Sequence, residues 1–149
     1  MKKVCLLFFV VALFLSSYAQ YVDLGLPSGT KWKSSNKAGF YTYEKAVNTF
    51  GDKLPTKKQC EELKDKCKWT WNGNGYKVTG PNGQSIVLPA TSHRDCDGDV
   101  HDVGFYGYYW SSTPDGSDCA WSLDFYSDWV DMHDYIRRCG GLTVRLVQD

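Results

Sequence analysis

The sequence predicts a single α+β domain, and two observations indicate this fold class. Helix signals are confined to residues 42–67, whereas short apolar segments with a period of two follow from residue 69 to the C-terminus. Helices followed by a run of strands are typical of α+β domains, in which the two kinds of element segregate. The 149 residues suffice for one domain and are too few for two comfortable ones.

The N-terminal residues have the pattern of a secretory signal peptide. Two lysines precede an uninterrupted apolar run over residues 4–15, and small residues follow at Ser17 and Ala19. We expect cleavage after Ala19, so that residues 1–19 are removed and residues 20–149 form the exported domain, in the extracellular space, at the cell surface or in the periplasm. An uncleaved anchor is the alternative, although the run is short for a membrane span. No later segment is apolar enough to insert into a membrane.

The charge and cysteine content of the predicted mature chain narrow the function classes. Removal of the two leading lysines leaves 15 basic residues against 17 acidic ones. Such a nearly neutral chain has no electrostatic reason to bind nucleic acid or an anionic membrane. The five remaining cysteines are irregularly spaced and odd in number, which does not describe a disulfide framework. We therefore expect an aromatic-rich core to supply most of the stability.

The two predicted helices have recognisable ends. Thr42 is placed to cap a short helix that Gly51 ends, and Thr56 with Gln59 forms a capping box at the start of the second helix. Helical residues seven positions apart lie about 10 Å apart, so the two cysteines of the second helix cannot bridge each other and are predicted to fill the core. The apolar faces contain Tyr43, Ala46, Val47 and Phe50 in the first helix, and Cys60, Leu63 and Cys67 in the second.

Short strands are predicted on both sides of the helices. The start of the mature chain alternates briefly and turns at residues 27–29, which indicates an edge strand. Asn-Gly turns separate the segments that follow Trp69, a polar loop is expected over residues 91–104, and residues 114–116 close a further strand. The predicted inward-facing sets are Trp69/Trp71, Tyr76/Val78, Ile86/Leu88, Trp121/Leu123/Phe125, Val130/Met132 and Leu142/Val144/Leu146.

The polar loop raises the question of a metal site. Asp95, Asp97 and Asp99 alternate there, and carboxylates in such a loop can wrap a calcium ion. The calcium loop of EF-hands, however, requires glycine where this chain has Val100 and an acid where it has Tyr106. We therefore favour a solvated acidic loop over a calcium site. The neighbouring histidines match no strong ligand spacing for a transition metal.

Enzyme signatures are weak throughout the sequence. No nucleophile stands in an activating turn such as G-x-S-x-G, and the hydroxyl residues 111–113 are explained equally well by a strand end that hydrogen-bonds its own turn. Paired carboxylates of the glycosidase kind cannot be recognised from abundance alone. We expect no catalytic residues and no cofactor.

The interleaved polar residues of the last strands are predicted to form a ligand-binding surface. Tyr, Asp, Ser and Arg are typical of adaptable recognition surfaces, and several exposed aromatic or apolar side chains together are typical of contacts. The alternative is an ordinary solvated sheet face. We expect the ligand to be a protein or a glycan on a neighbouring surface. The predicted ligand-binding residues are Asp115, Ser122, Asp124, Tyr126, Trp129, Asp131, His133, Tyr135, Ile136 and Arg138.

Five collinear motifs resemble those of the Fibrobacter succinogenes major paralogous domain family, which is common in exported proteins of Bacteroidota and Fibrobacteres. The resemblance covers nearly all of the predicted mature chain. It implies a C-type-lectin-like fold, distantly similar to sulfatase-modifying-factor domains, with two helices, a small twisted antiparallel sheet and a long irregular binding region near the C-terminus. The motifs are DLGLPSGTKW, LPTKKQCEELKDKCKWTW, GYKVTGPNGQSIVLPA, GYYWSST and GLTVRLVQD.

The sequence also departs from related families in ways that limit what the resemblance implies. The calcium- and sugar-binding tripeptides of true C-type lectins are absent, so calcium-dependent sugar binding is not carried over. No motif matches the cysteines of formylglycine-generating enzymes. An oxidase or hydrolase of the sulfatase-modifying kind would require paired accessible groups, for which Cys119 and Cys139 are the cysteine candidates. A structural subunit of a surface assembly is the third possibility.

The C-terminal strands further resemble the variable proteins of diversity-generating retroelements, which display randomised residues on a lectin-like fold. Adenine-directed mutagenesis of Asn codons yields a restricted set of amino acids, and Trp129 lies outside that set. The hypothesis is that this face was diversified by such an element or by divergence among paralogues. The positions within the set include Asp115, Gly116, Ser117, Asp118, Cys119, Ser122, Asp124, Tyr126, Asp131, His133, Asp134, Tyr135, Ile136, Arg138 and Cys139.

Overall fold

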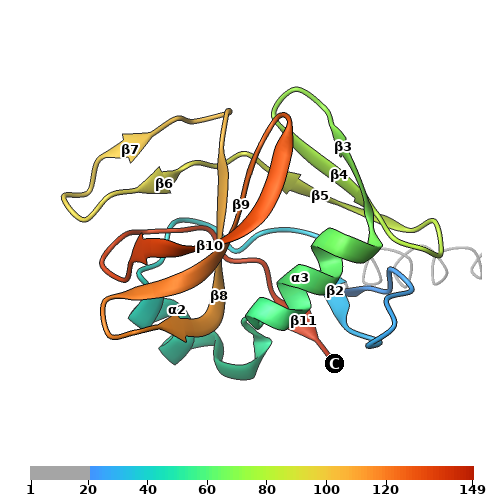
Figure 1. Cartoon of the computed structure of the whole chain (residues 1–149), viewed down its shortest axis with the longest axis horizontal. Coiled ribbons are helices and arrows are strands. Elements are labelled where there is room, and N and C mark those ends of the chain that lie inside the picture. The colour runs from blue at the N-terminus through green and yellow to red at the C-terminus, as the bar shows by residue number, and fades with distance from the viewer. Residues whose placement is uncertain (1–20) are drawn as a thin grey trace, which may run out of the picture.

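The two helices precede most of the strands, as the sequence predicts (Figure 1). The structure is a computed structural model that describes residues 21–149, so the predicted signal peptide over residues 1–19 lies outside the described residues. The elements are β1 (Tyr21–Val22), β2 (Lys31–Lys33), α2 (Tyr43–Phe50), the 3-10 helix η1 (Gly51–Lys53), α3 (Lys57–Lys66), β3 (Lys68–Trp71), β4 (Gly75–Thr79), β5 (Ser85–Pro89), β6 (His93–Arg94), β7 (Val100–His101), β8 (Gly107–Asp115), β9 (Cys119–Tyr126), β10 (Trp129–Arg137) and β11 (Val147–Gln148).

Local side-chain hydrogen bonds define both helices. The Thr42 hydroxyl accepts from the amide of Lys45 at the start of α2, and Gly51 ends that helix with a φ of +53°. Thr56 and Gln59 form the predicted capping box of α3. Each cap satisfies backbone donors that the first turn of a helix leaves free, which is why the helix starts could be read from the sequence.

The two cysteines predicted for the second helix differ in burial. Cys60 and Leu63 are fully buried, whereas Cys67 lies just beyond the end of α3 and is half-buried. Neither cysteine is in a disulfide, which confirms that the two do not bridge each other.

Four small antiparallel sheets carry the rest of the fold. Their strand orders are β1-β2-β11, β3-β4-β5, β10-β9-β8 and β6-β7. The predicted hairpins of β3, β4 and β5 are present, with Trp69 opposite Val78 and Val78 opposite Ile86. In the described part of the chain, these sheets together with α2 and α3 make an α+β domain. Within residues 21–149 no helix is long and apolar enough to cross a membrane.

Two segments differ from the sequence-based expectation. The expected polar loop over residues 91–104 contains the short β6–β7 hairpin. The expected strand through Leu142, Val144 and Leu146 is instead an irregular buried segment, which forms isolated bridges to Tyr41 and Tyr109 before the two residues of β11. The prediction of one apolar face was wrong here, because the intervening polar side chains at 143 and 145 are as deeply buried as the apolar ones.

The buried guanidinium of Arg145 in this segment is hydrogen-bonded to acceptors from other parts of the chain. Its Nε donates to Asn36 Oδ1 over 2.7 Å, and its Nη1 and Nη2 donate to the carbonyl oxygens of Lys33 (2.9 Å) and Val87 (2.5 Å). Burial lowers the pKa of Arg145 to about 10, although the fixed fork of the guanidinium still suits three acceptors at once. The side chain therefore joins three chain segments that are far apart in the sequence.

The sheet β10-β9-β8 lies in the middle of the molecule, between the β6–β7 hairpin and the β3-β4-β5 sheet (Figure 1). Successive residues of β9 point to opposite faces of the sheet, and each face meets a separate core cluster. Leu123 and Phe125 belong to the cluster that includes Leu63 of α3, whereas Ala120 belongs to the cluster that includes Tyr43 of α2. Both faces of β9 are consequently covered.

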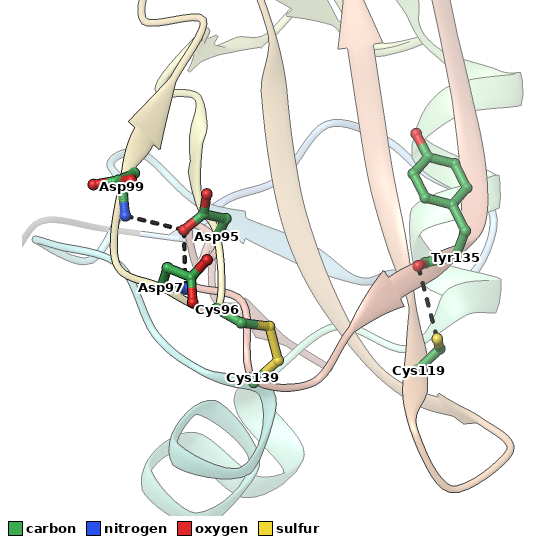
Figure 2. The surroundings of a disulfide bond; sticks show 7 residues. All are labelled: Asp95, Cys96, Asp97, Asp99, Cys119, Tyr135 and Cys139. Carbon is green, nitrogen blue, oxygen red and sulfur yellow. Dashed lines mark hydrogen bonds between the residues drawn. A yellow bond between two sulfur atoms is a disulfide. The ribbon is translucent and has the colours of Figure 1, made fainter.

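One disulfide reinforces the region beside this sheet. Cys96 in the β6–β7 turn is bonded to Cys139 in the loop after β10, across 43 positions of sequence (Figure 2). Next to it, Arg94 and Gly141 exchange two backbone hydrogen bonds of 2.8 Å each. The irregular cysteine spacing did not reveal this bond, because its partners meet only when the hairpin folds against the C-terminal loop.

Candidate binding site

The predicted binding surface on β9 is only partly a surface. Ser122 and Asp124 are completely buried, which corrects the expectation that both point outward. The register places Tyr108 of β8 opposite Asp124, and Trp110 opposite Ser122. Because directly opposed residues lie on the same face of an antiparallel pair, these large rings cover the two short polar side chains.

The buried Asp124 interacts with a histidine on the edge strand. Its Oδ2 lies 3.1 Å from Nδ1 of His133, while its Oδ1 has no hydrogen-bond partner. Burial raises the pKa of Asp124, and the contact with Asp124 raises the pKa of His133. The Ser122 and Tyr135 side chains favour the ionised carboxyl, yet neither completes a hydrogen bond to Oδ1. One carboxylate oxygen is therefore buried without a donor.

Aromatic rings lie on the same face of the sheet as this carboxylate. The Tyr106 ring is stacked on the Tyr126 ring at a centroid distance of 4.9 Å and on the Tyr108 ring at 6.0 Å. The His133 ring contacts the rings of Trp129 (5.5 Å) and Tyr135 (5.1 Å). We call this set the aromatic face: Tyr106, Tyr108, Tyr126, Trp129, His133 and Tyr135.

The outer part of the aromatic face is open to solvent. Tyr135 is 56% exposed and Trp129 is 36% exposed, both on β10. β10 is an edge strand, and its ladder with β9 is interrupted between His133 and Ile136, where the register shifts. Residues 134 and 135 thus lie in an irregularity that turns the Tyr135 side chain outward.

The other predicted site residues have separate structural roles. Asp131 is paired with Lys64 of α3, with 3.0 Å between the carboxylate and ammonium groups. Ile136 packs against the α2-side core cluster, and Asp115 lies opposite Cys119 at the end of the β8–β9 hairpin. Asp131 also lies directly opposite Asp124 and so is on the same side of the sheet as the aromatic face, whereas Ile136 and Asp115 flank that face.

Arg138 holds the loop ends together. Its guanidinium donates to the carbonyl oxygens of Cys119 (3.0 Å) and Gly116 (2.8 Å). The same group pairs with Glu44 at 3.2 Å and lies over the Tyr43 ring. Its donors are therefore engaged within the chain, which assigns it a structural role.

Sequence reasoning missed Tyr106 and Tyr108, which complete the aromatic face from the side of β8. Both precede Trp110 at alternate positions, so a period of two from Tyr106 onward was the available signal. That signal was masked because Tyr109 is also a large aromatic residue and belongs to the opposite core cluster.

The acidic loop is organised by its own hydrogen bonds. Asp95 Oδ1 accepts from the amides of Asp97 and Asp99, each at 3.0 Å (Figure 2). The Oδ2 of Asp95 lies 2.7 Å from Nε2 of His101. These contacts lower the pKa of Asp95 and raise that of His101. Among residues 21–149 no group of three or more His, Cys, Asp or Glu side chains could hold a metal ion.

Cys119 and Cys139, the cysteine candidates for a paired site, are not bonded to each other. Cys139 is bonded to Cys96, so Cys119 is left as a free thiol whose Sγ lies 3.7 Å from the Tyr135 carbonyl oxygen (Figure 2). Burial raises the pKa of Cys67 to about 11 and that of Cys60 further. A raised pKa keeps these two thiols protonated and unreactive at neutral pH.

No family model, curated protein or solved structure matches the chain. The residues and geometry of the aromatic face are therefore the basis for assigning a function.

Proposed function

We propose that the protein is an exported, non-catalytic binding module that presents its aromatic face to a protein or glycan on a neighbouring surface. The observation that carries this proposal is the exposure of Trp129 and Tyr135 beside the half-buried Tyr126 and His133. Aromatic side chains supply large contact areas at low conformational cost.

The strands beneath the aromatic face support this role. The β9–β10 hairpin is anchored to the core through Leu123, Phe125 and Met132, all of which are buried. A face held on rigid strands loses little conformational entropy when a ligand binds, so more of the contact energy contributes to affinity.

We further propose that the domain has the C-type-lectin-like fold of the Fibrobacter succinogenes major paralogous family. The five collinear motifs and the combination of two helices with small antiparallel sheets support this assignment. The Cys96–Cys139 disulfide supports export, because such bonds persist in oxidising compartments.

We also propose that the aromatic face was diversified, but at fewer positions than the sequence alone suggests. The burial of Ser122 and Asp124 limits which positions can vary freely, so we place the variable positions mainly on β10 and the hairpin turns. A near-copy of the coding segment with adenines at these codons, beside a reverse transcriptase gene, would support a retroelement origin. A genome that lacks both would exclude it.

A binding screen tests the proposed function. The wild-type protein and a Tyr126→Ala/Trp129→Ala/Tyr135→Ala variant are applied to arrays of glycans and of bacterial surface proteins. We expect the triple variant to lose wild-type binding, because truncating aromatic anchors at an interface typically costs more than about 1 kcal/mol each. Tyr21→Ala, which removes a half-buried tyrosine from β1, is the matched control, and circular dichroism checks folding. Equal binding by the wild type and the triple variant would remove the proposed face.

A further inference from the structure

The aromatic face lies in the most acidic part of the chain. From Asp95 to Ile136 the sequence contains ten aspartates and no lysine or arginine, whereas eleven lysines lie between residues 31 and 77. This acidic stretch forms the β6–β7 hairpin, β8, β9 and almost all of β10. The ten aspartates are Asp95, Asp97, Asp99, Asp102, Asp115, Asp118, Asp124, Asp128, Asp131 and Asp134.

Three of these carboxylates are exposed near the aromatic face without a cation. Asp102, Asp128 and Asp134 are exposed, and no ion pair within residues 21–149 includes any of them. Asp134 lies between His133 and Tyr135 on β10, Asp128 precedes Trp129 in the β9–β10 turn, and Asp102 contributes to the raised pKa of Tyr108. A surface with one sign of charge attracts ligands of the opposite sign and disfavours anionic ones.

The centre of the aromatic face contains a buried hydrogen-bond acceptor that has no donor. Asp124 is fully buried and its Oδ1 lacks a donor, as does the neighbouring Ser122 Oγ. Buried polar atoms in native proteins are normally paired, and a group that stays unpaired calls for a physical explanation. A ligand that brings its own N–H donors would satisfy this oxygen.

Aromatic rings and a carboxylate together define the chemistry of such a ligand. The faces of tyrosine and tryptophan rings attract cations, and guanidinium groups also stack on them through their flat surfaces. A neutral sugar would stack on the rings but would not be attracted by the negative charges of the aspartates. The combination therefore favours a cationic group over a neutral or acidic one.

We propose that the aromatic face binds a basic segment of a protein partner, with an arginine or lysine side chain stacked on Tyr135 and Trp129 and hydrogen-bonded to Asp124. This inference rests on the proposed binding function and names its ligand class. Tyr135 provides the entrance, because it is exposed and lies where the β9–β10 register shifts. Its ring can turn aside without breaking a regular part of the ladder.

Short peptides of defined charge test the inference. The probes are acetyl-(Gly-Arg)3-amide and the corresponding lysine and glutamate peptides, titrated calorimetrically into the full-length mature protein in 150 mM salt. We expect the arginine peptide to bind most tightly, the lysine peptide to bind more weakly and the glutamate peptide not to bind. Raising the salt concentration should weaken binding of the basic peptides, because exposed charges are screened.

Variants locate the binding on the face. Tyr135→Ala should weaken arginine-peptide binding about fivefold, the effect of losing one exposed cation–π contact. Asp102→Asn/Asp128→Asn/Asp134→Asn should weaken it further and flatten its salt dependence, and these exposed substitutions leave the core intact. Asp124→Asn probes the buried acceptor. Asp52→Asn removes one exposed carboxylate from the 3-10 helix η1 and is the matched control, for which we expect unchanged binding.

Three results would overturn the inference: no binding of the arginine peptide, equal binding of the glutamate peptide, or a loss in Asp52→Asn as large as that in the Asp102/Asp128/Asp134 variant. The array screen separates this failure from failure of the binding function. If the arginine peptide does not bind while an array ligand is lost in the Tyr126/Trp129/Tyr135 variant, the face binds a ligand and the ligand is not cationic.

Discussion

Removal of the Cys96–Cys139 disulfide should have a large effect on stability. The bond closes a loop of 43 positions that includes β8, β9 and β10. In the chain-entropy description, a cross-link over a loop of this size restricts the unfolded chain by about 4 kcal/mol at 25 °C. For a domain of this length, that corresponds to a fall in melting temperature of about 12–20 °C.

The measurement compares urea and thermal unfolding of the wild type with Cys96→Ser/Cys139→Ser, both under non-reducing conditions. Reduction of the wild type should reproduce the effect of the double variant. Cys119→Ser is the control, because that thiol is free and half-buried, and we expect it to change the unfolding free energy by less than about 1 kcal/mol.

Two results would refute this reasoning. One is a melting temperature that stays the same when the wild type is reduced, since the bond would then restrict nothing that unfolding releases. The other is a loss in Cys119→Ser as large as that in the double variant. Mass spectrometry after alkylation of the unfolded, unreduced protein should label Cys60, Cys67 and Cys119 and leave the bonded pair unmodified.

Three further predictions follow from individual side chains. Arg145→Met should lower the free energy of unfolding by about 3 kcal/mol or more, because its three buried acceptors lose their donor, and Arg145→Lys should recover part of this loss in chemical denaturation. Gly107→Ala should lower it by about 1–3 kcal/mol, because the added methyl carbon would lie 2.0 Å from the ring of Phe125. A Gly107→Ala substitution that costs as much in a Phe125→Leu background as in the wild type would argue against this steric cause. The contact with Asp124 raises the pKa of folded His133, so its stabilisation is complete below the unfolded pKa and is lost as the pH rises through the folded pKa. Wild-type stability should therefore fall as the pH rises above about 6.5, and His133→Gln should show a flatter profile there. The raised pKa of Asp124 acts in the same direction at lower pH.

The parts of the fold that the sequence predicted well depend on neighbouring residues. The starts of α2 and α3 were predictable because Thr42 and Thr56 bond to amides three residues later. The β3–β4–β5 hairpins were predictable because the tight turns and the alternation of residues lie within a few positions of each other. Such signals require no knowledge of the tertiary structure.

Predictions that assumed one solvated face failed for the central elements. Alternation along β9 suggested that Ser122 and Asp124 face water, yet a strand in the middle of a sheet that is packed on both sides has no solvated face. The same assumption turned the buried segment of residues 142–146 into a strand. A polar residue can be buried at such a position when a hydrogen-bond partner from elsewhere in the chain offsets the cost of its burial. Arg145 has such partners in its three acceptors, and Asp124 has one in His133.

The sequence by itself determined the α+β class, the two capped helices, the early hairpins and the aromatic residues of β10 at which a ligand is expected. Only the tertiary structure decided which polar residues of the last strands are buried, that Cys96 meets Cys139, and that Tyr106 and Tyr108 join the aromatic face. The physical reason is the range of the interactions. Caps and turns are fixed by contacts within a few residues, whereas burial, cross-linking and the composition of a surface depend on elements that approach one another only in the folded chain.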